Sequence, residues 1–293
     1  MEILIGLASI ALTTGITLII LPYAFAFIYL FPAAVFFKIY RLIYLKPDQK
    51  ANSEFWDFPR RIAHRIWLRI AWLWHGYEVH GLEHIPRNGP ALIIFFHGAI
   101  PADGYFLHSK IFMTTGRQAH FVVDNFLFKF PWYKIYSECM QTLPGTIASC
   151  VDLLKEGNLL MIAPGGTYEG QFGDKNYKIL WRNRLGFAKV ALEAGVDIIP
   201  FFSTNIQEAY RPVGWFESFW EKIYLKTRLP IVPLFGGFPV KIKTYIGEPI
   251  KISKDMRPEK VKEIVVQKMQ DLIRKHQRIP GSIANALLER FPH

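Results

Sequence analysis

The clearest candidates for chemistry are a histidine and an aspartate in the run Ala91-Leu-Ile-Ile-Phe-Phe-His97-Gly98-Ala99-Ile100-Pro101-Ala102-Asp103. The apolar residues before His97 predict a buried strand, so His97 lies where that strand ends. Pro101 suits the first position of a helix, which puts Asp103 in the first turn, where the helix dipole favours a carboxylate. Asp103 can then hold one imidazole nitrogen and leave the other as a general base. A purely structural histidine is the alternative.

A second candidate is a glycine-rich turn that follows the apolar run Leu159–Ala163. Consecutive glycines leave backbone N–H groups unencumbered by side chains, and such groups stabilise an oxyanion or bind phosphate. An ordinary tight turn after a strand is the alternative. We predict an oxyanion-stabilising or substrate-binding role for Gly98, Pro164, Gly165, Gly166, Thr167 and Glu169.

Short strands alternating with helices are expected to position these residues. The predicted strands are Tyr77–His80, Ala91–Phe96, Phe121–Val123, Leu159–Ile162, Ile198–Phe202, Ile231–Leu234 and Val240–Ile246. Helical periodicity marks Leu185–Ala194, which ends at Gly195, and a late helix that Pro258 opens. This alternation predicts an α/β domain with a mixed, mostly parallel sheet flanked by helices.

The N-terminal tract has no charged residue from Ile3 to Phe37. A continuous helix of that length would run roughly 50 Å, beyond the roughly 30 Å hydrocarbon core of a membrane. Pro22 and Pro32 predict that it bends or divides. We expect a retained anchor over residues 1–38, as one span over Ile3–Leu21 or as a re-entrant hairpin. It lacks the basic start and the small-residue cleavage site of a signal peptide.

Basic and aromatic residues dominate residues 39–75. Arg61, Arg65 and Arg69 recur every four residues beside a stripe of isoleucines, and Trp56, Trp67, Trp72 and Trp74 supply amphipathic rings. This pattern is typical of a helix in the membrane interface, with a surface helix of a soluble core as the alternative. The basic residues after the anchor place residues 76–293 on the cytosolic side by the positive-inside rule.

Composition supports a membrane-associated globular protein. Apolar residues make up 51% of the 293 residues and the formal net charge is +11, which excludes a disordered chain and favours anionic partners. No nucleic-acid recognition motif and no Gly-x-Ser-x-Gly hydrolase elbow occur. The two cysteines, Cys139 and Cys150, have neither metal-ligand nor disulfide spacing. We therefore expect no metal site and no nucleic-acid partner.

Taken in order, these runs resemble the glycerolipid acyltransferase superfamily, the PlsC-like group that also has kinship with diacylglycerol acyltransferase type 2. The resemblance rests on the His97-to-Asp103 block, on Pro164-Gly165-Gly166-Thr167, and on the strand at Val196–Phe201 between Tyr77-Glu-Val-His-Gly81 and Ile246-Gly-Glu-Pro-Ile250. It implies a glycerol-3-phosphate acyltransferase-like fold, with His97 and Asp103 as the catalytic residues. It also implies acyl-CoA as co-substrate, with no bound cofactor.

The sequence departs from the common family pattern at two places that bear on the acceptor. Five residues, not four, separate His97 from Asp103, and Pro164-Gly165-Gly166-Thr167 stands where phosphate-acceptor members commonly have Pro-Glu-Gly-Thr. The stretch Met140–Ser149, where the family usually supplies an arginine, has no basic residue. Since an acceptor phosphate needs a cation, an uncharged acceptor, monoacylglycerol or diacylglycerol, is favoured.

Other readings stay open at this point. A lysophosphatidic acid or lysophospholipid acyltransferase is the nearest alternative, and a non-catalytic membrane lipid-binding protein is a further one. The resemblance implies the endoplasmic reticulum membrane, with the catalytic domain on the cytosolic face. The aromatic stretch Trp215–Trp220 either lines an acyl groove, lies against the bilayer or packs in the core. The candidates for holding CoA phosphates, which can equally form a solvated basic face, are Lys175, Lys178, Arg182 and Arg184.

Overall fold

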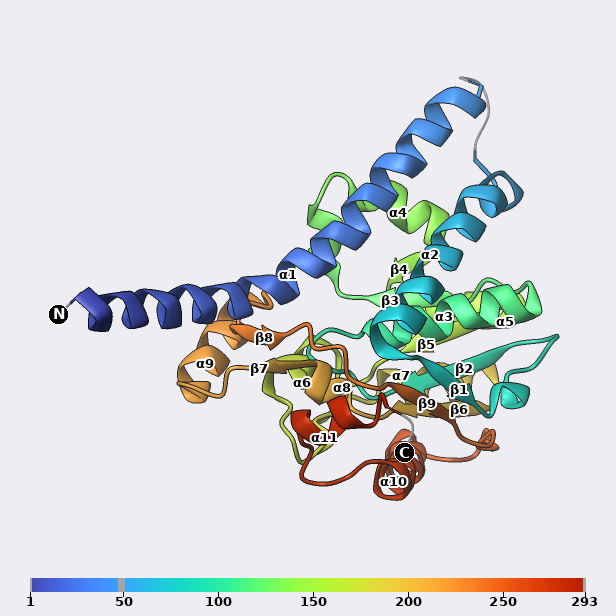
Figure 1. Cartoon of the computed structure of the whole chain (residues 1–293). Helices are drawn as coiled ribbons and strands as arrows, with labels where there is room; N and C mark the ends of the chain where they lie inside the picture. The colour runs from blue at the N-terminus through green and yellow to red at the C-terminus, as the bar shows by residue number, and fades with distance from the viewer. Residues whose placement is uncertain (1, 47–50, 292–293) are drawn as a thin grey trace.

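The structure, a computed structural model, describes residues 2–46 and 51–291. Its centre is a seven-stranded sheet in the order β1-β9-β6-β2-β5-β3-β4 (Figure 1). Every neighbouring pair is parallel except β6 and β9, which are antiparallel. The predicted mixed, mostly parallel α/β sheet is therefore confirmed. The strands are β1 Glu78–His80, β2 Ala91–Phe95, β3 His120–Val123, β4 Thr142–Pro144, β5 Leu159–Ile162, β6 Ile198–Ser203 and β9 Lys243–Ile246.

A smaller antiparallel pair, β7 (Tyr210–Pro212) and β8 (Leu234–Gly236), stands apart from the main sheet. The helices that follow the N-terminal one are α2 Asp57–His75, α3 Ala102–Thr115, α4 Tyr133–Met140, α5 Ile147–Lys155, α6 Gly166–Phe172, α7 Gly186–Ala194, α8 Ile206–Ala209, α9 Glu217–Thr227, α10 Pro258–His276 and α11 Ile283–Leu288. Three short 3-10 helices cover Glu54–Trp56, Leu82–His84 and Asn125–Lys129.

The core packs against both faces of the sheet. Ile93 and Phe95 of β2 share one buried cluster with Leu107 and Ile111 of α3. The alternate residues of the same strand, Leu92 and Ile94, share another with residues of α5, α7 and α10. Because successive side chains of a strand point to opposite faces, β2 is a fully buried inner strand, and its carboxyl end is held rigidly.

The N-terminal tract is one helix, α1 (Glu2–Tyr44). At 43 residues it is about 65 Å long, and it bends part-way along its length (Figure 1). Pro22 and Pro32 are interior residues of this helix that lack an amide proton. The chain does not turn back on itself near Pro22, so the expected re-entrant hairpin is not formed. Each proline leaves one helical hydrogen bond unmade, and the helix bends without being interrupted.

One stretch of α1 has the length and composition of a membrane span. Among the residues whose side chains the structure describes, this window is Phe27–Tyr44, of which 11% is buried. The buried residues of this window, Ala34 and Phe37, share a cluster with residues of α4, and α1 also contacts β8. The predicted segments 1–38, 39–75 and 76–293 stay predictions, and residues 1, 47–50 and 292–293 within them lie outside the described ones.

Helix α2 is amphipathic, but in a different way from the prediction. Arg61, Arg65 and Arg69 are exposed together with Trp72 and Leu73. Trp56 and Trp67, which we expected to be interfacial rings, are buried instead. They pack against α1, Trp56 on Phe37 and Trp67 on Tyr29. These two tryptophans therefore join α1 to the domain.

Candidate active site

His97 lies at the carboxyl end of β2, in the loop that leads to α3. Its backbone N–H donates to Glu169 Oε2 at 2.9 Å, and its ring Nδ1 lies 2.7 Å from the Gly98 carbonyl oxygen. A carbonyl only accepts, so Nδ1 carries the proton and Nε2 carries the lone pair. In the described residues, no hydrogen bond occupies Nε2. The ring is therefore in the tautomer that a general base requires.

The electrostatic surroundings keep His97 neutral. Burial lowers the pKa of the imidazole to about 4, and the nearby Arg184 guanidinium lowers it further, whereas the hydrogen bond to Gly98 and the Asp124 carboxylate raise it. Since the residue is only half-buried, a substrate can still reach it. At neutral pH the ring is uncharged and able to accept a proton.

Contrary to our expectation, Asp103 does not hold the imidazole of His97. It is 1% exposed in the first turn of α3, its Oδ1 has no partner, and no hydrogen bond joins it to His97 within the described chain. Burial raises the pKa of this carboxyl to about 7, against a hydrogen bond with the Ser203 side chain. The Gly98 carbonyl occupies the position on Nδ1 that we expected Asp103 to take.

Glu169 is buried among hydrogen-bond donors. It is 0% exposed, and its predicted substrate-binding role stays a prediction. Besides the His97 amide, its carboxylate accepts from Leu180 N at 2.8 Å and from Trp181 Nε1 at 3.3 Å. Burial raises its pKa to about 7, and these donors oppose the shift. Glu169 thereby fixes the loop of His97 to the helix that follows the glycine turn.

The carbonyl oxygens of the glycine turn accept hydrogen bonds, and its glycines lie close to neighbouring atoms. Arg184 Nη1 donates to the carbonyls of Pro164 and Gly165, at 3.0 and 2.8 Å. The Gly166 amide, at φ 48°, donates to Ala163 O, so it is not the free oxyanion donor that we expected. A Cβ on Gly165 would lie 2.4 Å from Glu169. In the described residues the Gly98 and Gly165 amides are among those with no hydrogen-bond partner, so both are available as donors.

Two residues of the site were not predicted from the sequence. Gly170 of α6 lies against the imidazole, because a Cβ there would come within 2.7 Å of His97 Nδ1. Asp124, directly after β3, accepts from Thr167 Oγ1 at 2.8 Å. Strand β5 pairs with both β2 and β3, so the residues after these three strands meet at one edge of the sheet, as is usual for α/β sites.

The four predicted phosphate-binding cations do not form one cluster. Arg184 binds the glycine turn, as described above, and Arg182 lies over the Tyr168 ring at 4.8 Å. Lys175 and Lys178 are exposed. The described residues contain no group of three or more potential metal ligands.

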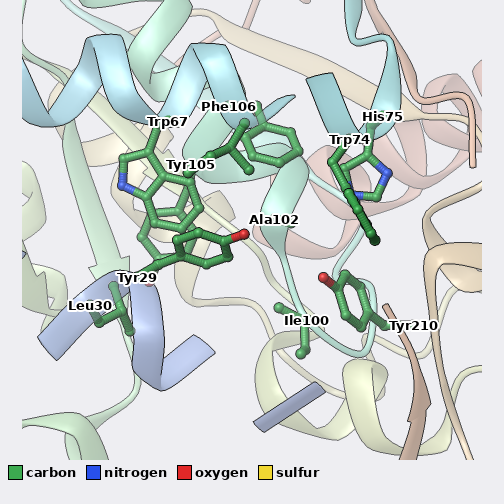
Figure 2. A pocket seen from close by; sticks show the side chains of 11 residues that line it. Tyr29, Leu30, Trp67, Trp74, His75, Ile100, Ala102, Tyr105, Phe106 and Tyr210 are labelled. Atoms are coloured by element: carbon green, nitrogen blue, oxygen red, sulfur yellow. The ribbon is translucent and has the colours of Figure 1, made fainter. Parts of the chain in front are cut away.

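An apolar cavity of about 40 Å³ adjoins the loop between His97 and Asp103 (Figure 2). Ile100 and Ala102 of this loop line it, together with Tyr29 and Leu30 of α1 and the aromatic face of Trp67. Trp67 stacks on Tyr105 and is tilted against Tyr29, with ring centroids 5.3 and 5.1 Å apart. The cavity therefore links the candidate membrane helix to the loop that carries His97.

Comparison with known proteins places the chain in a family. A family model described as Acyltransferase matches residues 76–204. A human protein named "DGAT1/2-independent enzyme synthesizing storage lipids" is 44% identical over 279 residues, which cover 95% of this chain and 85% of that protein. The chain belongs to the glycerolipid acyltransferase superfamily. A bovine protein of the same name is likewise 44% identical to this acyltransferase, over 95% of the chain and 82% of the relative.

A solved structure shares the fold of this acyltransferase. The 1-acyl-sn-glycerophosphate (LPA) acyltransferase PlsC from Thermotoga maritima superposes with a TM-score of 0.55, over 89% of this chain and 96% of that one. The sequence identity is 17%, so the likeness concerns the fold alone.

Proposed function

We propose that this acyltransferase moves a fatty acyl group from acyl-CoA to the hydroxyl of a monoacylglycerol or diacylglycerol. Nε2 of His97 takes the hydroxyl proton while the oxygen attacks the thioester carbonyl. The new C–O bond forms, the C–S bond breaks, and the proton passes from the imidazolium to the departing CoA sulfur. The observation that carries this proposal is the His97 ring itself, neutral, with Nδ1 donating to Gly98 and Nε2 free.

Backbone amides supply the charge stabilisation in this proposal. The tetrahedral intermediate bears an oxyanion, which needs preorganised donors. The amides of Gly98 and Gly165 are without partners among the described residues, and Arg184 holds the Gly165 carbonyl away from them. We assign the oxyanion to these two amides in place of Gly166.

The uncharged acceptor rests on two observations. Residues 140–149, which include strand β4, carry no basic side chain, so this stretch offers no cation to bind an acceptor phosphate. The cavity beside the His97 loop is lined by aromatic and aliphatic side chains and begins at α1. The name of the human relative refers to storage-lipid synthesis, which fits the same acceptor.

Lys175 and Lys178 are proposed to bind CoA phosphates. The cytosolic face of the endoplasmic reticulum is the proposed location.

The deciding experiment is an acceptor panel on the full-length protein in detergent micelles. Labelled acyl-CoA is supplied with monoacylglycerol, diacylglycerol or lysophosphatidate, and the acylated product is measured. His97→Ala is expected to lower acylation of a neutral acceptor by on the order of 10²-fold or more. His80→Ala, an exposed histidine on β1, is the matched control and should retain activity. If the protein acylates lysophosphatidate alone, the proposed neutral acceptor is wrong. If His97→Ala still transfers the acyl group, His97 is not the general base.

A further inference from the structure

Helix α9 has one face packed on the helix that carries the glycine turn and the other face in solvent. Tyr224 is 2% exposed, and its ring lies 6.0 Å from Tyr168 and 5.9 Å from Phe172, both of α6. Tyr168 also donates its hydroxyl hydrogen to Glu221 Oε1 at 2.8 Å. The inner face of α9 is therefore fixed to the candidate active site.

The first turn of α9 and the two residues before it expose large aromatic side chains. Trp215 is 73% exposed, Phe216 79% and Phe219 55%. Phe216 has φ 58°, a left-handed conformation that is uncommon for a bulky residue and costs free energy unless something compensates for it. Three neighbouring aromatic rings in solvent form an apolar patch of the kind that marks an interaction site. We call Trp215, Phe216 and Phe219 the aromatic tip.

Exposed charged residues continue along α9 from the aromatic tip. Glu217 lies within the tip, and the cations Lys222, Lys226 and, at the end of the helix, Arg228 follow it. Amphipathic rings followed by a row of cations match the interface of a bilayer, where rings enter the headgroup level and cations meet anionic lipids.

The aromatic tip is also continuous with the candidate membrane helix. The segment containing α9 connects β7 to β8, and β8 packs against α1. Figure 1 shows α9 at the end of the domain from which the N-terminal half of α1 extends. Phe27 and Ile28 of α1 are exposed there as well. A bilayer that receives α1 therefore lies within reach of α9.

We propose that the aromatic tip inserts into the headgroup region of a membrane containing anionic lipid, as a second membrane contact besides α1. This contact places α6, and with it the His97 site, directly at the lipid surface. It deepens the proposed function, since a glycerolipid acceptor has to pass from the bilayer to His97. Its test does not depend on acyl transfer.

The test reads the depth of single positions in the full-length protein reconstituted into phosphatidylcholine–phosphatidylserine vesicles. An environment-sensitive fluorophore is attached through Phe216→Cys or, separately, Phe219→Cys; Cys139 and Cys150 are buried and serve as the unlabelled background. Lys268→Cys, an exposed position on α10, is the control on the far side of the domain (Figure 1). The quenchers are lipids with brominated acyl chains and aqueous iodide.

We expect bromolipid to reduce the fluorescence of the labels at 216 and 219 and iodide to have little effect, with the opposite result at 268. Omitting phosphatidylserine should weaken the bromolipid quenching. Labels at 216 and 219 that iodide quenches as strongly as at 268 would overturn the proposal. Labels that neither quencher reaches would overturn it too, since a protein surface would then cover the tip. Failure of acyl transfer would change neither readout.

Discussion

The backbone amide of His97 donates to the carboxylate of Glu169 across 72 positions of sequence, at 2.9 Å. This bond joins the loop after β2 to the helix after β5, which are the two segments that bring the candidate base and the glycine turn together. Because the same carboxylate also accepts from Leu180 and Trp181, it holds three segments in one geometry. The position of the imidazole thus depends on a fully buried carboxylate.

Replacing Glu169 by glutamine should therefore damage catalysis without removing any group that reacts. The amide keeps one acceptor oxygen but turns an NH₂ toward N–H donors, which leaves a buried donor unsatisfied at a cost of about 1–3 kcal/mol. If the His97 loop shifts by about 1 Å, the turnover number should fall on the order of 10²-fold. Steady-state acylation and thermal unfolding measure the two effects. Glu193→Gln, exposed on α7, is the control; an unchanged rate for Glu169→Gln would contradict the positioning role.

Gly170 offers a sharper probe of the same contact. A methyl group there would lie 2.7 Å from His97 Nδ1 and 2.8 Å from Gly98 O, so Gly170→Ala must push the imidazole away from its carbonyl partner. We expect a loss of acylation together with about 1–3 kcal/mol of destabilisation, as for other overpacked sites. Gly186→Ala has nothing within 4 Å and should leave both quantities unchanged. Equal activities of the two variants would show that the ring does not depend on this packing.

The sequence was sufficient for the inner strands and for the place of His97 at the end of one of them. Ala91–Phe95, Leu159–Ile162 and Ile198–Ser203 are buried along their whole length or nearly so, and such continuous apolar runs are what a pattern can identify. Strands β4 and β7 were missed because each is three residues long and ends in a proline. Strand β8 begins where the predicted Ile231–Leu234 ends, because the apolar run there is a turn.

The details of the site depended on information that is not local. Whether Nδ1 of His97 meets Asp103 or Gly98 is decided by how a loop folds, and spacing alone favoured Asp103. Glu169 looked like a polar residue in a substrate loop, yet two distant donors, at Leu180 and Trp181, require its burial. Asp124 was overlooked because the strand order that brings β3 beside β5 cannot be read from one sequence.

The pH dependence of acylation tests the state of His97. Because burial and Arg184 hold its pKa at about 4, kcat/KM should be constant from about pH 6 to 8 and should fall only as the pH approaches 4, where the base becomes protonated. Asp124→Asn removes a charge that raises this pKa, so the acid midpoint should move lower; Arg184→Gln should move it higher. Rates are measured at each pH, and full recovery of activity after return to neutral pH excludes unfolding. A midpoint near 6.5 would mean that the ring is solvated.

We expect replacement of Asp103 to affect the thermal stability of the protein more directly than its turnover number. Its pKa is raised to about 7 by burial, above the ordinary value of about 3.9. The folded state therefore retains a proton that the unfolded state loses, and this residue costs stability progressively as the pH rises from about 4 to 7. Asp103→Asn removes that cost, so the gain in Tm over the wild type should be small at pH 5 and larger at pH 8.

The size of the gain is expected to be about 2–4 °C for each kcal/mol of relief, measured by thermal unfolding in the same detergent at each pH. Asp152→Asn, an exposed carboxyl on α5, should show no such pH-dependent difference. If Asp103→Asn lowers Tm at every pH, the carboxylate is stabilised by a partner in solution. That outcome would contradict the buried, incompletely paired carboxyl of the structure.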